Sequence, residues 1–213
     1  MAFGAGMHVF PGGSVDPADA DADIAWAGPP ASWWADVLLA DEPRARSLVC
    51  AAVRETFEEC GVLLAGPAQD QLLPDVSSEE WEAERVALEA REQTLSELLA
   101  RRRLVLRTDL LRPLGHWITP ELEPKRFDTR FFLAAMPAGQ LARDVGSEAD
   151  ARVWVRPQDA LSRQLAMMPP TAAMLTDLAG APDVAAALAV PRTIATVQPQ
   201  FVLDGDELQL VVP

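Results

Sequence analysis

The sequence predicts a single α/β domain, an α/β/α sandwich in which helices cover a mixed β-sheet. Three observations support this class. Hydrophobic residues make up 49% of the 213 residues, which is enough for a sizeable core. Helix-like and strand-like segments occur along the whole chain, and they do not alternate strictly. No internal repeat or interdomain linker is evident, so residues 1–213 are expected to form one domain.

The first part of the chain is predicted to lead into one amphipathic helix. Residues 1–13 indicate a strand of three or four residues that runs into the Pro-Gly-Gly turn. Residues 14–43 are rich in Asp, Ala and Pro and are interpreted as a long surface insertion with a short helix near 32–39. Residues 44–60 place apolar side chains at helical spacing, and Gly61 is a plausible helix end.

The middle of the chain is predicted to contain a buried strand and a long helical insertion. Val62-Leu63-Leu64 is typical of a buried strand. Residues 78–103 form the longest helical pattern, with Ser77 or Ser78 as its N-cap. The three arginines at its end, Arg101–Arg103, complement the helix dipole there.

The last part of the chain alternates between strands and helices. Strands are expected at 111–118, 130–136 and 152–155, followed by a short helix at 157–165, one or two helices within 169–189, and a hairpin at 200–213. The helical segment at 169–189 is broken by Gly-Ala-Pro, and the hairpin is centred on an Asp-Gly pair.

Composition excludes several classes of function. The net charge of −14 argues against non-specific nucleic-acid binding and against docking on an anionic membrane. An anionic substrate would need a metal ion or placed arginines to neutralise it. No signal peptide or membrane-length apolar run is visible, so a cytoplasmic protein is expected. Cys50 and Cys60 lie about 15 Å apart on one helix, which is too far for a disulfide.

The strongest chemical signal is a cluster of glutamates on the 44–60 helix. Glu55, Glu58 and Glu59 stand at i, i+3 and i+4, so they share one helix face. Their mutual repulsion is worsened by the negative end of the helix dipole, and Arg54 can reach Glu58 to offset part of it. Such carboxylate density suits a hard divalent cation. The alternative is a solvated acidic helix face in an acidic protein.

The residues around the glutamates decide between these alternatives. The stretch Arg54-Glu55-x-x-Glu58-Glu59-x-Gly61-Val62, with Gly13 before it, resembles the Nudix hydrolase box. Thr56 departs from the aliphatic residue usual in the family. The spacing departs more, because Arg54 follows Gly13 by 41 positions where the arginine of the uninterrupted box follows the glycine by 14, an excess of 27. The first acidic position of the box therefore stays open: Asp19 fits the count from Gly13, and Arg46 occupies the count back from Arg54.

One branch of the family, the eukaryotic peroxisomal coenzyme A diphosphatases, has an insertion of this kind, and this chain resembles that branch. We expect a bacterial member of it. The resembling stretches are 8–13 with Asp16, 52–64, 117–120 and 126–129. The resemblance implies a Nudix-type sandwich. It also implies that one or two strands which normally precede the Pro-Gly-Gly strand are missing here, and that an N-terminally extended chain would be more soluble and more active.

The resemblance implies hydrolysis of a phosphoanhydride bond in a nucleoside diphosphate linked to another group, with coenzyme A or acyl-coenzyme A as a candidate. Magnesium or manganese would be held by Glu55, Glu58 and Glu59. Arg54 would orient a box carboxylate and serve catalysis together with Glu58 and Glu59. Gly13 and Gly61 would permit the turns on either side of the helix.

Other residue roles remain open at this point. The general base would be Glu59 or, as a second candidate, Glu148, which could equally be a solvated loop acid. Arg126 could contact a phosphate, or it could form a structural pair with Asp128 or another carboxylate. His116 and Trp117 could line an adenine pocket, although a hydrogen-bonded histidine in an apolar strand is more common, and His8 presents the same choice.

The implied partner is a small nucleotide-type molecule, with no nucleic acid and no membrane, and a homodimer is compatible with the sequence. Two further hypotheses stand beside the enzyme. The first is a catalytically silent Nudix-fold module for ligand sensing or protein contacts, against which the intact glutamates speak. The second is a structural acidic protein.

Overall fold

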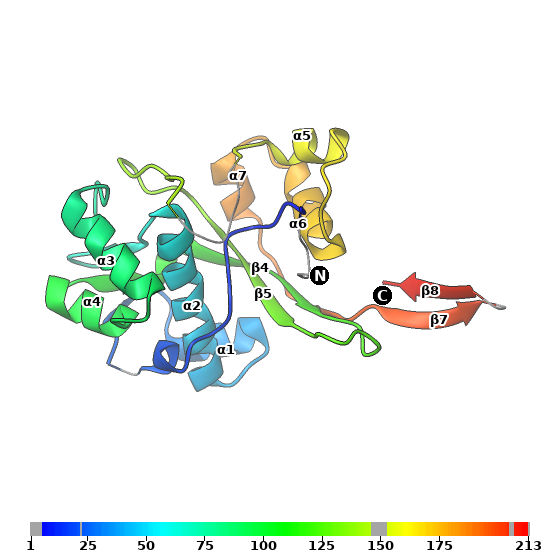
Figure 1. The fold of residues 1–213 in the computed structure, drawn as a ribbon, viewed down its shortest axis with the longest axis horizontal. Coiled ribbons are helices and arrows are strands. Elements are labelled where there is room, and N and C mark those ends of the chain that lie inside the picture. Colours follow the sequence, from blue (N-terminus) through cyan, green and yellow to red (C-terminus); the bar gives the residue numbers. More distant parts are fainter. Residues whose placement is uncertain (1–5, 22, 146–152, 205–206, 213) are drawn as a thin grey trace.

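A long helix, α2 (Glu42–Cys60), lies at the centre of the larger part of the structure (Figure 1). The computed structural model describes residues 6–21, 23–145, 153–204 and 207–212. The mixed α/β class predicted from the sequence is confirmed.

Local sequence sets the ends of α2. The Asp41 side chain accepts a hydrogen bond from the Arg44 N–H, so it caps the first turn. Gly61 ends the helix in the left-handed conformation, at φ 65°, as predicted. The other helices are α1 (Ala31–Leu38), α3 (Glu79–Glu89), α4 (Leu95–Arg102), α5 (Pro157–Ser162), α6 (Pro169–Ala179) and α7 (Val184–Ala189), with short 3-10 turns η1 (Pro17–Ala20) and η2 (Thr108–Leu110).

The described strands form two three-stranded sheets and a hairpin rather than the one sheet expected. The sheets have the orders β1-β3-β2 and β5-β4-β6, and each mixes parallel with antiparallel pairing. The strands are β1 (Trp26–Ala27), β2 (Ala65–Gly66), β3 (Val105–Arg107), β4 (Leu111–Ile118), β5 (Asp128–Ala134), β6 (Thr196–Val197), β7 (Gln200–Asp204) and β8 (Glu207–Val211).

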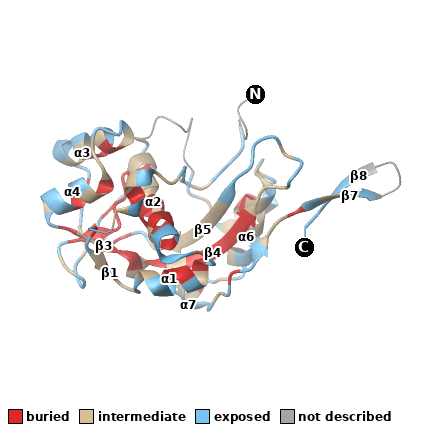
Figure 2. Ribbon diagram, turned by 90° about the horizontal axis from the view of Figure 1, so that it is seen from below, coloured by how far each residue is buried: buried red, intermediate tan, exposed pale blue. Residues whose placement is uncertain are grey.

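The predicted C-terminal hairpin is present as β7 paired with β8, and it projects away from the rest of the molecule (Figures 1 and 2). The predicted strands at 111–118 and 130–136 correspond to β4 and β5, and the helices within 169–189 to α6 and α7.

The main core surrounds α2. Fully buried side chains from α2, such as Val53 and Phe57, pack with Trp34 and Leu38 of α1 and with Leu106 of β3. A smaller cluster joins β4 to α6. Figure 2 shows buried positions concentrated on α2, β3 and β4. Cys50 and Cys60 are buried thiols of this helix, and burial raises the pKa of Cys50 to about 12.

Three predicted strands do not form among the described residues. Of residues 6–13, His8 alone pairs, in an isolated bridge with Met167, and residues 1–5 lie outside the described part of the chain. Residues 62–64 are buried but not a strand, because the side chain of Gln140 occupies both backbone groups of Leu63, at 2.9 and 3.0 Å. Residues 153–155 have no strand pairing, and Arg152 lies outside the described residues.

Two predicted insertions also differ. Residues 14–43 are not a surface excursion, since Trp34 and Leu38 within them are fully buried. The helix expected at 78–103 is two helices, α3 and α4, separated by a turn in which Arg91 has φ 58°. A new N-cap begins α4, where Thr94 and Glu97 form a capping box. Among the described residues, no helix is both long and apolar enough to cross a membrane.

Candidate active site

The last two turns of α2 present the three predicted glutamates. Glu55, Glu58 and Glu59 are each half-buried, and the helix ends at Cys60, directly after Glu59, with Gly61 as its C-cap. The opposite side of these turns is anchored by Phe57, which is fully buried in the main core. The carboxylates therefore project from a rigid element.

Arg54 joins these carboxylates to the chain that precedes α2. Its Nε and Nη2 donate to the two oxygens of Asp19, each at 3.0 Å. Its Nη1 donates to Glu55 at 2.9 Å and to Glu58 at 3.0 Å, which is the i, i+4 contact predicted from the sequence. Its Nη2 also donates to the Ser14 carbonyl at 2.8 Å. One guanidinium thus contacts three carboxylates; we call Arg54, Asp19, Glu55, Glu58 and Glu59 the box cluster.

The geometry favours Asp19 for the acidic position that the sequence left open. Asp19 is 1% exposed, and its second oxygen accepts the Asp16 N–H at 2.8 Å. Arg46, the other residue that fitted the spacing, instead donates to the carbonyls of Asp21 and Ile24, at 3.0 and 2.7 Å. The count from Gly13 identifies this residue, because the extra residues lie between Asp19 and Arg54.

The Pro-Gly-Gly segment packs directly on the glutamates. A Cβ added to Gly13 would lie 2.5 Å from Oε1 of Glu55, closer than real contacts allow. The Gly12 N–H donates to Oε1 of Glu59 at 3.3 Å. The backbone on this side thus fixes where two of the carboxylates can lie, and it gives a physical reason for glycine at position 13.

Burial and charge act in opposite directions within the box cluster. Burial raises the pKa of Glu58, and the neighbouring Glu55 and Asp19 raise it further, whereas Arg54 opposes the shift. Burial works against the charge of Arg54, but its contacts with Asp19, Glu58 and Glu55 raise the pKa of its guanidinium. A second cation beside these carboxylates would relieve the same repulsion.

The donor atoms of the box cluster are of the kind that a hard divalent cation prefers. Glu55, Glu58 and Glu59 supply carboxylate oxygens from one helix face, which Mg²⁺ and Mn²⁺ favour. Within the described part of the chain, no group of three or more His, Cys, Asp or Glu side chains forms a preformed metal-binding site. Glu55 and Glu58 direct oxygens at Arg54, so a bound cation would share these groups with the guanidinium.

Arg126 lies on the loop between β4 and β5, apart from the box cluster. Its Nε donates to the Thr119 carbonyl at 3.1 Å, and the side chain is exposed. The Asp128 carboxylate considered as its partner contacts Arg130 instead. Figure 1 shows this loop at a distance from α3, against which α2 packs. The structure does not bring Arg126 to the glutamates.

His116 is a hydrogen-bonded core residue, as its apolar strand indicated. It is 4% exposed, its Nε2 lies 2.7 Å from Oδ1 of Asp128, and its Nδ1 lies 2.8 Å from the Thr196 hydroxyl. Burial lowers the pKa of His116. It lines a cavity of about 280 Å³ together with Trp117. His8 is exposed and contacts the Ala166 carbonyl at 3.2 Å.

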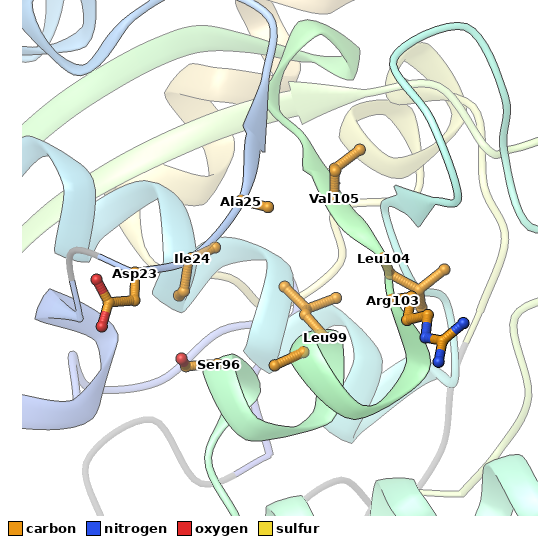
Figure 3. A pocket seen from close by; sticks show the side chains of 9 residues that line it. Asp23, Ile24, Ala25, Ser96, Leu99, Arg103, Leu104 and Val105 are labelled. Atoms are coloured by element: carbon orange, nitrogen blue, oxygen red, sulfur yellow. The ribbon is translucent and has the colours of Figure 1, made fainter.

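Another cavity, of about 330 Å³, lies between the segment that enters β1 and the end of α4 (Figure 3). Ile24, Leu99 and Leu104 line it together with the polar Ser96 and Arg103. None of its lining residues belongs to the box cluster. Glu148, the second candidate base, lies outside the described residues.

Sequence reasoning missed a residue of α3 that contacts the end of α2. Arg85 of α3 is 3% exposed and donates to the backbone carbonyl of Glu58. Trp81, Arg85 and Leu88 follow one another at i, i+4 and i+7, so a charged residue within this apolar stripe was the available signal.

Comparison with known proteins agrees with this geometry. Residues 35–175 match the family model described as the NUDT19 Nudix domain. The chain is 28% identical over 122 residues to the acyl-coenzyme A diphosphatase NUDT19 of Xenopus laevis. That alignment covers 52% of this chain and 32% of the frog protein, about a third of its length.

A solved structure extends the likeness to nearly the whole chain. The crystal structure of a NUDIX hydrolase from Alicyclobacillus acidocaldarius is similar to this fold with a TM-score of 0.70 and 32% sequence identity. The match covers 91% of this chain and 85% of the other. Together with the family model and the box cluster, this likeness establishes that the chain is a Nudix hydrolase, belonging to the group described by the NUDT19 Nudix domain.

Proposed function

We propose that this protein hydrolyses the diphosphate bond of nucleoside diphosphate derivatives with a divalent metal ion at the box cluster. One observation carries the proposal: Arg54 gathers Asp19, Glu55 and Glu58 at the end of α2, with Gly13 packed on Glu55. A purely structural acidic face would be solvated, whereas the side chains of Arg54 and Asp19 are only 11% and 2% exposed.

Nudix hydrolases generally use divalent metal ions. In this chain Glu55, Glu58 and Glu59 would hold Mg²⁺ or Mn²⁺, which when bound neutralises phosphate charge and lowers the pKa of coordinated water. Arg54 would restrict the rotamers of Glu55 and Glu58, since its Nη1 donates to both. The backbone of Gly13 would limit Glu55 from the other side.

Glu59 is our candidate for the base that takes the proton from the attacking water. It is half-buried, and its Oε1 accepts a hydrogen bond from the Gly12 N–H. That contact orients the carboxylate. The base must lie within hydrogen-bond reach of the attacking water. Glu59 shares a helix face with Glu55 and Glu58, the other proposed metal ligands, which supports its candidacy.

We base the proposed substrate class on the net charge of the chain and on its relatives. A chain with a net charge of −14 repels a diphosphate unless cations neutralise it locally. The frog relative is described as an acyl-coenzyme A diphosphatase, which makes coenzyme A and acyl-coenzyme A the first compounds to test. Arg126 is exposed, and we propose that it contacts a distant phosphate of an extended substrate.

A mass-spectrometric screen with Mg²⁺ or Mn²⁺ tests the proposal. The compounds would be coenzyme A, acetyl-coenzyme A, NADH, ADP-ribose and dinucleoside polyphosphates. We expect two phosphate-terminated products from at least one compound, and no product once EDTA removes the metal. Product formation that persists in EDTA would contradict the metal dependence. Absence of products, together with no Mn²⁺ binding at millimolar concentration, would favour the silent ligand-sensing module.

A further inference from the structure

The last turn of α2 ends with backbone carbonyls that have no partner within the helix. One of them, the carbonyl of Glu58, accepts a hydrogen bond from Nη1 of Arg85 at 2.7 Å. Arg85 comes from α3, and its side chain is 3% exposed. A buried guanidinium is therefore fixed on the backbone of a residue in the box cluster.

Two carboxylates on α3 hold Arg85 in that position. Glu82 accepts from its Nε at 3.0 Å and from its Nη2 at 2.8 Å. Glu89 accepts from its Nη1 at 2.7 Å. Both contacts lie at helical spacing on α3, so the helix presents the guanidinium in one orientation.

A second arginine, Arg143, contacts both the end of α2 and Glu82. Nη1 of Arg143 lies 2.9 Å from Oε2 of Glu82, and the Arg143 backbone N–H donates to the Cys60 carbonyl at 2.8 Å. A Cβ added to Gly61 would lie 2.7 Å from Nη2 of Arg143. Two guanidinium groups are thus grouped at the negative end of the α2 dipole.

The helix that carries Arg85 is docked on α2 by apolar packing as well. Trp81 of α3 meets Phe57 of α2 edge to face, with ring centroids 6.3 Å apart. Figure 1 shows α3 and α4 beside α2, at the side of the molecule opposite the hairpin. The insertion that separates β2 from β3 therefore supports the turn of α2 that carries the glutamates.

We propose that Arg85 is a positioning residue that holds the last turn of α2 in the geometry required for metal binding; this rests on the proposed function. Three clustered carboxylates and the helix dipole all place negative charge at this end. The Arg85 guanidinium opposes that charge, and its bond to the Glu58 carbonyl keeps the turn from fraying. Without it, the glutamates would lose their common geometry even though each side chain remains.

The test uses Mn²⁺ alone, measured by the loss of the free-ion signal in electron paramagnetic resonance, on Arg85→Met, Arg85→Lys and the wild type. Residues that orient metal ligands change metal affinity by about 10–100-fold when replaced. We expect Arg85→Met to weaken Mn²⁺ binding by about tenfold or more, and Arg85→Lys to recover part of the loss. The matched control is Arg101→Met, because Arg101 links Glu84 and Gln93 within the same insertion.

Folding and function are separated by measuring all variants well below their melting temperatures, with circular dichroism as a check. If Arg85→Met does not fold, Glu82→Gln replaces it, since Glu82 accepts hydrogen bonds from Nε and Nη2 of Arg85. Unchanged Mn²⁺ affinity in a folded variant would overturn the role of Arg85 while leaving the proposed function intact. A wild type that neither binds Mn²⁺ nor hydrolyses any diphosphate would overturn both.

Discussion

Arg54 and Asp19 form a bidentate ion pair, with both nitrogen–oxygen distances at 3.0 Å, although they are 35 positions apart in the sequence. The pair connects η1 to α2 across the insertion that interrupts the Nudix box. Both side chains are shielded from solvent, so the charges are little screened. The insertion thus leaves intact the contact between the two ends of the box.

Replacing Asp19 with asparagine removes one of the charges that neutralise Arg54. Removing the sole partner of a buried charge destabilises a protein by about 3–5 kcal/mol. Glu55 and Glu58 still face Arg54, so we expect the smaller penalty of about 1–3 kcal/mol typical of a buried polar group left short of a partner. Urea unfolding measures this change. Asp36→Asn, at an exposed position of α1, should change stability little; equal effects at both sites would contradict the account.

Gly13→Ala tests whether the backbone at Gly13 sets the position of Glu55. The new methyl would lie 2.5 Å from Oε1 of Glu55, and the flexible carboxylate would move rather than the fold. We expect a stability change below about 1 kcal/mol and a marked loss of Mn²⁺ affinity and of turnover. Gly180→Ala is the control, because no atom lies within 4 Å of its added Cβ. Full Mn²⁺ affinity in Gly13→Ala would show that Glu55 is not a ligand in this geometry.

The buried His116 should make the protein less stable in mild acid. Burial lowers its folded-state pKa below the unfolded value of about 6.5. As pH falls through 6.5 the unfolded state takes up the proton first, so stability declines. His116→Gln should remove this part of the decline between pH 7.5 and 5.5, measured by urea unfolding at each pH. An unchanged slope in His116→Gln would refute the assignment.

Most of the helices were predictable because their signals are local. The apolar stripe of α2 and its stop at Gly61 are readable from adjacent residues, and so is the Gly-Ala-Pro break between α6 and α7. The hairpin of β7 and β8 follows from one Asp-Gly pair within an alternating pattern. Each of these elements depends on contacts within a few residues of the chain.

Two of the failed predictions depend on distant contacts. Residues 62–64 have a strand-like composition, but Leu63 gives its backbone groups to Gln140, 77 residues away. The tryptophan-rich insertion enters the core because α1 packs against α2, which no local pattern specifies. The polar composition around α1 suggested a surface segment, and burial of Trp34 overrides it.

The candidate site divides in the same way. Glu55, Glu58, Glu59 and Arg54 were named from spacing on one helix. Asp19 and Arg46 could not be separated by counting, because the insertion breaks the register of the box. The structure separates them by showing which residue reaches Arg54.

The most direct test of the central claim is the turnover of Glu58→Gln and Glu59→Gln, with saturating Mg²⁺ and the best substrate from the screen. Each change preserves size and removes one negative charge from the proposed metal site. We expect a loss of more than about 100-fold in kcat for both, since even indirect supports of a metal site account for about 10–100-fold, with melting temperatures close to the wild type. Glu42→Gln, exposed in the first turn of the same helix, should keep full activity. Turnover within a few-fold of the wild type in both folded variants would contradict the account.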